Sequence, residues 1–125
     1  MIASSTDAET LPALRKALDA YCRASLPAPE SALRAELGAL KMQVRRPREG
    51  AEDLEMQARV YARQLSGYPA DIALYVLRTQ ADMDPWWPAW ADLSERLAML
   101  SRPRAAQRRA LEWLISEVEA RHEEA

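Results

Sequence analysis

The spacing of leucines constrains this chain more than any other feature. Leu33, Leu37, Leu40 and Val44 follow one another at intervals of four, three and four residues. This spacing places the four side chains on one face of an α-helix and leaves the other face polar. Comparable sets are Leu11, Leu14, Leu18 and Tyr21; Leu54, Ala58, Tyr61 and Leu65; Trp90, Leu93, Leu97 and Leu100; and Leu111, Leu114, Ile115 and Val118. The pattern therefore predicts several amphipathic helices that pack on one another.

The composition favours the same fold class. Of 125 residues, 49% are hydrophobic, and the chain has only three glycines and no phenylalanine. Alanine, leucine, glutamate and arginine dominate, and all four are strong helix formers. No run of alternating β-branched residues occurs, so we predict no strand. We expect a single all-α domain over residues 1–125, a compact bundle of five to six short helices without a sheet.

Glycine and proline mark two turns near the middle of the chain. Gly67 suits the position just after a helix, where the backbone often turns left-handed. Pro69 has the fixed φ of a first helical position. Pro85 and Pro88 cannot continue a helix without losing a backbone donor and crowding the preceding turn. We therefore predict a corner between two helices at the tryptophan-rich segment that these two prolines bracket.

The other breaks divide the chain into three parts. A helical hairpin is predicted over residues 10–45, and a basic segment with Pro and Gly separates it from a three-helix core over residues 51–100. Within this core, the helix that contains Tyr75 has apolar residues on several sides and is predicted to be central and buried. Pro103 is predicted to break the chain and to begin a C-terminal amphipathic helix over residues 103–122.

Catalytic and metal chemistry are not indicated. The one histidine, His122, lies in a charged stretch near the end of the chain, where no positioned base is expected. Cys22 follows Tyr21 on an apolar helix face and is predicted to be a buried small hydrophobe. One histidine and one cysteine cannot furnish a zinc site, and no calcium loop or glycine-rich phosphate loop is present. We therefore predict a protein that is not an enzyme, without catalytic residues, cofactor or metal.

Charge and cysteine content bear on partners and compartment. The chain has 17 basic and 19 acidic residues, a formal net charge of −2. This balance argues against a protein whose whole surface attracts nucleic acid. The single cysteine fits a reducing compartment, and the N-terminus has neither the basic nor the apolar region of a signal peptide. No apolar run reaches membrane-spanning length, so we predict a cytoplasmic protein that does not bind membranes.

Two groups of residues could bind a macromolecule near the middle of the chain. Trp86 and Trp87 either fill the corner between two helices or anchor a protein interface, and both alternatives remain open. Arg45, Arg46 and Arg48 form a basic cluster that could contact the phosphates of a single-stranded nucleic acid. The alternative is that these arginines lie in a solvent-exposed loop and have no binding role.

The predicted C-terminal helix is the third candidate. An amphipathic helix can dock its apolar face into a groove of a partner protein. The residues predicted to make this contact are Leu111, Leu114, Ile115 and Val118, with Arg104 and Arg108 flanking them. The same stripe could instead be the seam of a homodimer.

The order of elements between Tyr61 and Leu93 resembles a known family. The pattern is an aromatic residue, a leucine, a Tyr-Pro turn, an alanine- and leucine-rich helix, and an aromatic-proline corner that leads into a helix with an acid and a leucine. It is carried here by Tyr61, Leu65, Tyr68-Pro69, the helix through Leu77, and Trp87-Pro88-Ala89-Trp90-Ala91-Asp92-Leu93. It covers about a quarter of the chain and resembles the small bacteriophage replicative-helicase loader and inhibitor family. The family usually has a threonine where this chain has Ala89.

The resemblance implies a function that the residues alone do not. Proteins of this family load or restrain a hexameric DnaB-type helicase during phage replication, through a helical N-terminal domain and a helicase-contacting tail. On this basis we expect a phage or prophage DNA-replication accessory protein whose partner is the replicative helicase. Two alternatives remain: a module that binds single-stranded nucleic acid, and a self-associating helical protein.

Overall fold

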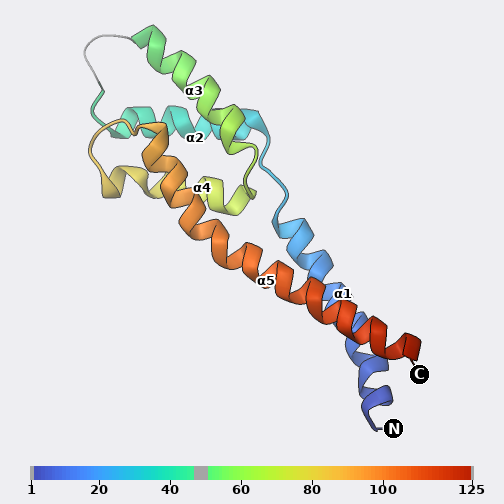
Figure 1. Ribbon diagram of the computed structural model, residues 1–125. Helices are drawn as coiled ribbons and strands as arrows, with labels where there is room; N and C mark the ends of the chain where they lie inside the picture. The colour runs from blue at the N-terminus through green and yellow to red at the C-terminus, as the bar shows by residue number, and fades with distance from the viewer. Residues whose placement is uncertain (1, 47–50, 125) are drawn as a thin grey trace. The chain divides into compact units, whose positions relative to one another are not determined.

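The computed structural model describes residues 2–46 and 51–124. Its elements are α1 (Ile2–Ala24), α2 (Glu30–Gln43), α3 (Ala51–Leu65), α4 (Ala70–Met83) and α5 (Trp90–Glu124), shown in Figure 1. Over the described residues no strand forms, and the one β-type pairing is an isolated bridge between Arg45 and Trp86. The predicted all-α class without a sheet is confirmed.

The contacts divide the chain into two compact units. The terminal unit consists of Met1–Ala24 and Arg102–Ala125, and the central unit is Ser25–Ser101. Helix α5 begins in the central unit and ends in the terminal unit.

The central unit is built around one apolar core to which four helices contribute. The buried core residues are Ala28 before α2, Leu33, Leu37, Leu40 and Val44 from α2 and its C-cap, Tyr61, Ala62 and Leu65 from α3, Ile72, Ala73, Val76 and Leu77 from α4, and Leu93 and Leu97 from α5. The leucine stripe of α2 thus faces the core as its spacing predicted. Leu100, predicted to extend the stripe of α5, is exposed instead, because the stripe leaves the core one turn after Leu97.

The turn before α4 differs in two details from the prediction: Pro69 is the N-cap of α4 rather than its first helical residue, and Gly67 has a different backbone conformation from the one predicted. Pro69 precedes α4, and its carbonyl accepts the N–H of Ala73 at 3.0 Å, which closes the first helical turn. The φ of Gly67 lies outside the left-handed region, so the predicted left-handed conformation is wrong. The N–H of Gly67 instead donates to the carbonyl of Gln64 at 3.2 Å. This tight three-residue bond needs no positive φ.

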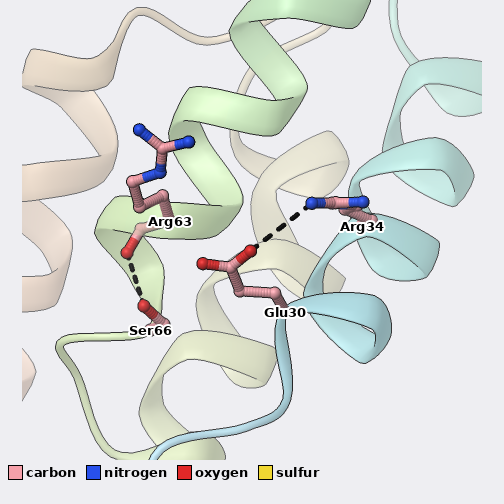
Figure 2. Close-up of polar contacts among 4 residues, drawn as sticks. All are labelled: Glu30, Arg34, Arg63 and Ser66. Atoms are coloured by element: carbon pink, nitrogen blue, oxygen red, sulfur yellow. Dashed lines mark hydrogen bonds and ion pairs between the residues drawn. The ribbon is translucent and has the colours of Figure 1, made fainter.

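Polar side chains stabilise the neighbouring ends of α2 and α3 (Figure 2). Glu30, the first residue of α2, forms an ion pair at 3.4 Å with Arg34 one turn later. The hydroxyl of Ser66 donates to the carbonyl of Arg63 at 2.5 Å, which satisfies one of the last α3 carbonyls that lack an intrahelical donor. The exposed ion pair contributes only about 0.3–0.5 kcal/mol, so the apolar core rather than these contacts holds the unit together.

Two helices extend further than predicted, and each contains a proline. Helix α1 begins at Ile2 rather than near residue 10 and continues through Pro12. Helix α5 continues unbroken through Pro103, so the predicted break before a separate C-terminal helix is wrong. A proline removes one backbone donor, but its φ of about −65° is compatible with a helix. Strong helix formers on both sides of each proline allow the helix to continue.

Two residues predicted to be buried are exposed. Tyr75 of α4 is 55% exposed, because Ala73, Val76 and Gln80 define a single buried face and Tyr75 lies outside it. The prediction that this helix is buried on several sides is therefore wrong. Cys22 is also exposed; it lies about 100° around the helix from Tyr21, which is enough to leave the apolar face.

In the terminal unit, α1 and the C-terminal part of α5 run antiparallel (Figure 1). Arg15 forms an ion pair with Glu119 at 2.7 Å. Near the other end of the pair, the guanidinium of Arg104 lies at a long 3.5 Å from the carbonyl of Ala24. Because residue numbers rise along one helix as they fall along the other, these contacts define the antiparallel pairing. None of the described helices is both long and apolar enough to cross a membrane.

Candidate functional site

The tryptophan corner is largely structural. The ring of Tyr61 stacks on Trp87 with 5.9 Å between centroids and 4° between planes, and it lies at 5.4 Å and 47° from Trp90. The Tyr61 hydroxyl donates to the carbonyl of Pro88 at 3.0 Å. The indole N–H of Trp87 donates to Gln57 Oε1 at 3.0 Å. Both polar tips are thus satisfied, and Trp87, which is half-buried, packs against α3 at this corner.

Trp86 lies on the outside of the same corner. It is 50% exposed, and the guanidinium carbon of Arg45 lies 5.9 Å from its ring centroid, a cation–π arrangement. The backbone reinforces the pair, because the N–H of Arg45 donates to the carbonyl of Pro85 at 2.6 Å. Arg46 is also exposed, and Arg48 lies outside the described residues. The structure therefore brings one predicted tryptophan and one predicted arginine together on the surface.

The predicted partner-binding stripe of the C-terminal helix is not one exposed surface. Ile115 and Val118 are buried in the terminal unit, and Leu111 is half-buried. Leu114 is 39% exposed. Of the four apolar residues predicted to contact a partner, Leu114 is therefore the one that is exposed to solvent. The spacing identified an apolar face correctly, but most of that face is covered.

The two predicted arginines of this helix have contacts within the chain. Arg104 lies near the end of α1, as described above. Arg108 forms an ion pair at 3.1 Å with Glu112 one turn later on the same helix. The Arg108–Glu112 pair is exposed, and exposed ion pairs of this kind contribute little to stability.

Sequence reasoning missed Trp113, which is 62% exposed on α5. It precedes Leu114 and lies outside the stripe that spacing selected. A tryptophan at a position off the apolar face was itself a signal, since large exposed aromatics commonly mark interfaces.

Sequence reasoning also missed an apolar groove between α4 and α5 in the central unit, the α4–α5 groove. It has a volume of about 220 Å³, and the lining residues are Tyr75, Met83, Arg96, Met99 and Leu100. All four apolar side chains in this set are exposed. Methionine side chains adapt to the shape of a partner, and neighbouring exposed apolar groups mark binding surfaces. The exposed methionines of both helices were the available signal in the sequence.

Arg96 is the one charged residue that lines this groove. Its guanidinium donates to the carbonyl of Val76 at 3.0 Å, to Gln80 Oε1 at 2.7 Å and to Thr79 Oγ1 at 2.6 Å. Burial lowers the pKa of Arg96 from its ordinary value. All three acceptors are uncharged, and no carboxylate among the described residues pairs with it. The groove therefore combines apolar walls with a positive charge that has no acidic counterpart there.

Within the part of the chain that the structure describes, no three His, Cys, Asp or Glu side chains gather as metal ligands. No model of a protein family, no curated protein and no solved structure matches this chain. The candidate surfaces therefore rest on the residues and contacts described above.

Proposed function

We propose that this chain is a non-enzymatic accessory protein of phage or prophage DNA replication, which acts in the cytoplasm by binding a hexameric DnaB-type helicase. The resemblance of residues 61–93 to the helicase loader and inhibitor family supports the choice of partner. The residues that carry it are close neighbours here, since Tyr61 contacts Trp87, Pro88 and Trp90. They build the corner from which α5 starts.

The observation that carries the proposal is the α4–α5 groove. Exposed apolar side chains surround it, and they come from two helices that the core holds together. A surface of this kind suits an amphipathic helix, which places apolar anchors at intervals of three and four residues into the groove. We assign the helicase contact to this groove in place of the C-terminal stripe, because Ile115 and Val118 are buried.

The charge of Arg96 indicates which kind of side chain the bound helicase segment carries. A carboxylate that approaches the groove would meet a guanidinium with no acidic partner and would form a charge-assisted hydrogen bond. We therefore expect the bound helicase segment to carry an aspartate or glutamate beside its apolar anchors.

The mechanism is a shift in the assembly of the helicase. A protein that binds one assembly state of a hexamer more tightly than another moves the population towards that state. No covalent step is required, and the sign of the difference in affinity decides whether the chain loads or restrains the helicase.

A binding measurement with purified replicative helicase tests this proposal. The full chain is expected to bind at micromolar concentration or below. Replacing Tyr75 and Met99 together with serine is expected to weaken binding about tenfold or more, equivalent to about 1.4 kcal/mol. The matched control replaces Met42 and Met56, which are also exposed but lie away from the groove, and is expected to bind like the original chain.

Two results would contradict the proposal. A chain that shows no binding to the helicase removes the helicase as partner. Equal weakening in the groove variant and in the control removes the groove as the contact. Thermal unfolding of both variants checks that the serines have not unfolded the protein.

The exposed pair of Arg45 and Trp86 favours a second candidate function, the binding of single-stranded nucleic acid. Stacking of one base on an aromatic ring contributes about 1–3 kcal/mol, and phosphate contacts make affinity fall as salt rises. If this candidate is correct, a labelled oligonucleotide will bind at low salt, and Trp86→Ala will abolish most of that binding while Tyr75→Ala will not. If the signal of the labelled oligonucleotide does not change when the protein is added at low salt, this function is ruled out.

A further inference from the structure

In the terminal unit, one face of α5 is buried, and the side chains on the opposite face follow a regular order. With about 100° between successive residues, one set of side chains lies within about 60° of Trp113. Its members are Arg102, Ala106, Arg109, Ala110, Trp113, Ser116, Glu117 and Ala120, and all of them are exposed. We call this set the Trp113 face. Ile115 and Val118 lie on the other side of the helix and are buried.

Trp113 is the centre of this face in both size and position. It is a large, mostly apolar side chain exposed to water on a helix whose opposite side is already packed. Covering an exposed tryptophan contributes strongly to association, and tryptophan is enriched among the residues that dominate interfaces. The small side chains of Ala106 and Ala120, one on each side of it, allow a second helix to approach closely.

The charges on the Trp113 face are arranged symmetrically about Trp113. Arg109 lies four residues before it and Glu117 four residues after it. Ala106 and Ala120 lie seven residues before and after it. The face is therefore basic on one side of the tryptophan and acidic on the other, with alanines at matching distances.

We propose that two copies of this chain associate through their Trp113 faces, with the two α5 helices antiparallel. A two-fold axis beside Trp113 would place Arg109 of each copy opposite Glu117 of the other. It would also place Ala106 opposite Ala120 of the second copy and bring the two Trp113 side chains together. A patch that is complementary to itself under a two-fold rotation is the requirement for an isologous dimer.

The order of charges favours a second copy over an unrelated partner. Any other protein would have to present the same sequence of acidic, aromatic and basic groups in reverse order, whereas a second copy does so by symmetry. A parallel arrangement is disfavoured, because it would place Arg109 against Arg109 of the second copy. Covering Trp113 supplies most of the affinity, and the exposed ion pairs select the orientation.

A charge-exchange experiment with the full chain tests this arrangement. In a dimer of Arg109→Glu, both pairs become acid against acid, and in a dimer of Glu117→Arg both become base against base. An equimolar mixture of the two variants restores both pairs in the heterodimer. Sedimentation velocity is expected to show a dimer for the original chain, about tenfold or more weaker association for each variant alone, and recovery in the mixture.

The controls separate this dimer from other effects. Arg63→Glu makes the same change in charge at an exposed position of α3 in the central unit and is expected to leave the dimer intact. Trp113→Ala is expected to make the chain monomeric while its circular dichroism stays unchanged. Recovery in the mixture also demonstrates that both charge variants are folded.

Three outcomes would overturn the proposal. An original chain that stays monomeric up to its solubility limit excludes the dimer and leaves the Trp113 face to a different partner. A dimer that tolerates both charge variants uses another surface. Loss of the dimer in each variant without recovery in the mixture excludes the antiparallel pairing of Arg109 with Glu117.

Discussion

Replacing Leu97 with alanine is expected to lower the free energy of unfolding by about 2–5 kcal/mol. Leu97 is fully buried in the central core, together with side chains from α2, α3 and α4. The shorter side chain loses apolar burial and leaves a cavity that a close-packed interior fills only in part. Urea denaturation followed by circular dichroism measures the change.

The matched control is Met99→Ala, two residues later on the same helix. Met99 is 63% exposed, so its truncation is expected to change the free energy of unfolding by no more than about 0.5 kcal/mol. Both substitutions replace a long apolar side chain with alanine in α5, and the difference between them therefore reports burial rather than helix propensity. A Leu97→Ala variant as stable as the control would contradict the core described here.

Replacing Tyr61 with alanine is expected to cost about 3–5 kcal/mol. The ring is stacked on Trp87 and packed against Trp90, and the hydroxyl donates to the carbonyl of Pro88. Removing the side chain leaves a cavity under the corner and deprives that carbonyl of its donor. Because the corner connects α4 to α5, we also expect altered tryptophan fluorescence. An unfolding midpoint within error of the original chain would contradict a structural role for Tyr61.

Tyr61→Phe separates the contribution of the ring from that of the hydroxyl. It keeps the stacked ring and is expected to cost only about 0.5–1.5 kcal/mol, as for the loss of one hydrogen bond. Burial raises the pKa of Tyr61 above its ordinary value of 10.0. As pH rises above about 10, the unfolded chain releases the phenolic proton while the folded chain retains it, so ionisation favours unfolding.

The stability associated with this neutral phenol is thus fully present below pH 10 and is lost as pH rises through the folded-state pKa. The Phe variant lacks this contribution, and the other tyrosines are common to both proteins. The stability difference between them is therefore expected to narrow at alkaline pH. A difference that stays constant between pH 8 and 11, measured by urea denaturation, would contradict a buried, neutral Tyr61.

The apolar faces of the helices and the corner between α4 and α5 could be predicted from the residues of each segment alone. The stripe of Leu33, Leu37 and Leu40 is buried, and Pro85 and Pro88 bracket a corner between two helices, as their spacing and missing donors predicted. The continuation of α5 through Pro103 could not be predicted from this local chemistry. A proline costs a helix roughly 3 kcal/mol, and whether the flanking residues offset that cost is a sum over the whole helix that local rules do not give.

Amino-acid spacing by itself determined the fold class and which residues of each helix share a face. It could not determine which face another element covers, because burial depends on residues far away in the chain. Ile115 and Val118 were therefore predicted to meet a partner but are buried in the terminal unit, while Trp113 remains exposed. Only the tertiary structure brings Tyr75 to one groove with Arg96 and Met99, since Tyr75 belongs to α4 and the other two to α5, and the packing of these two helices creates the space between them.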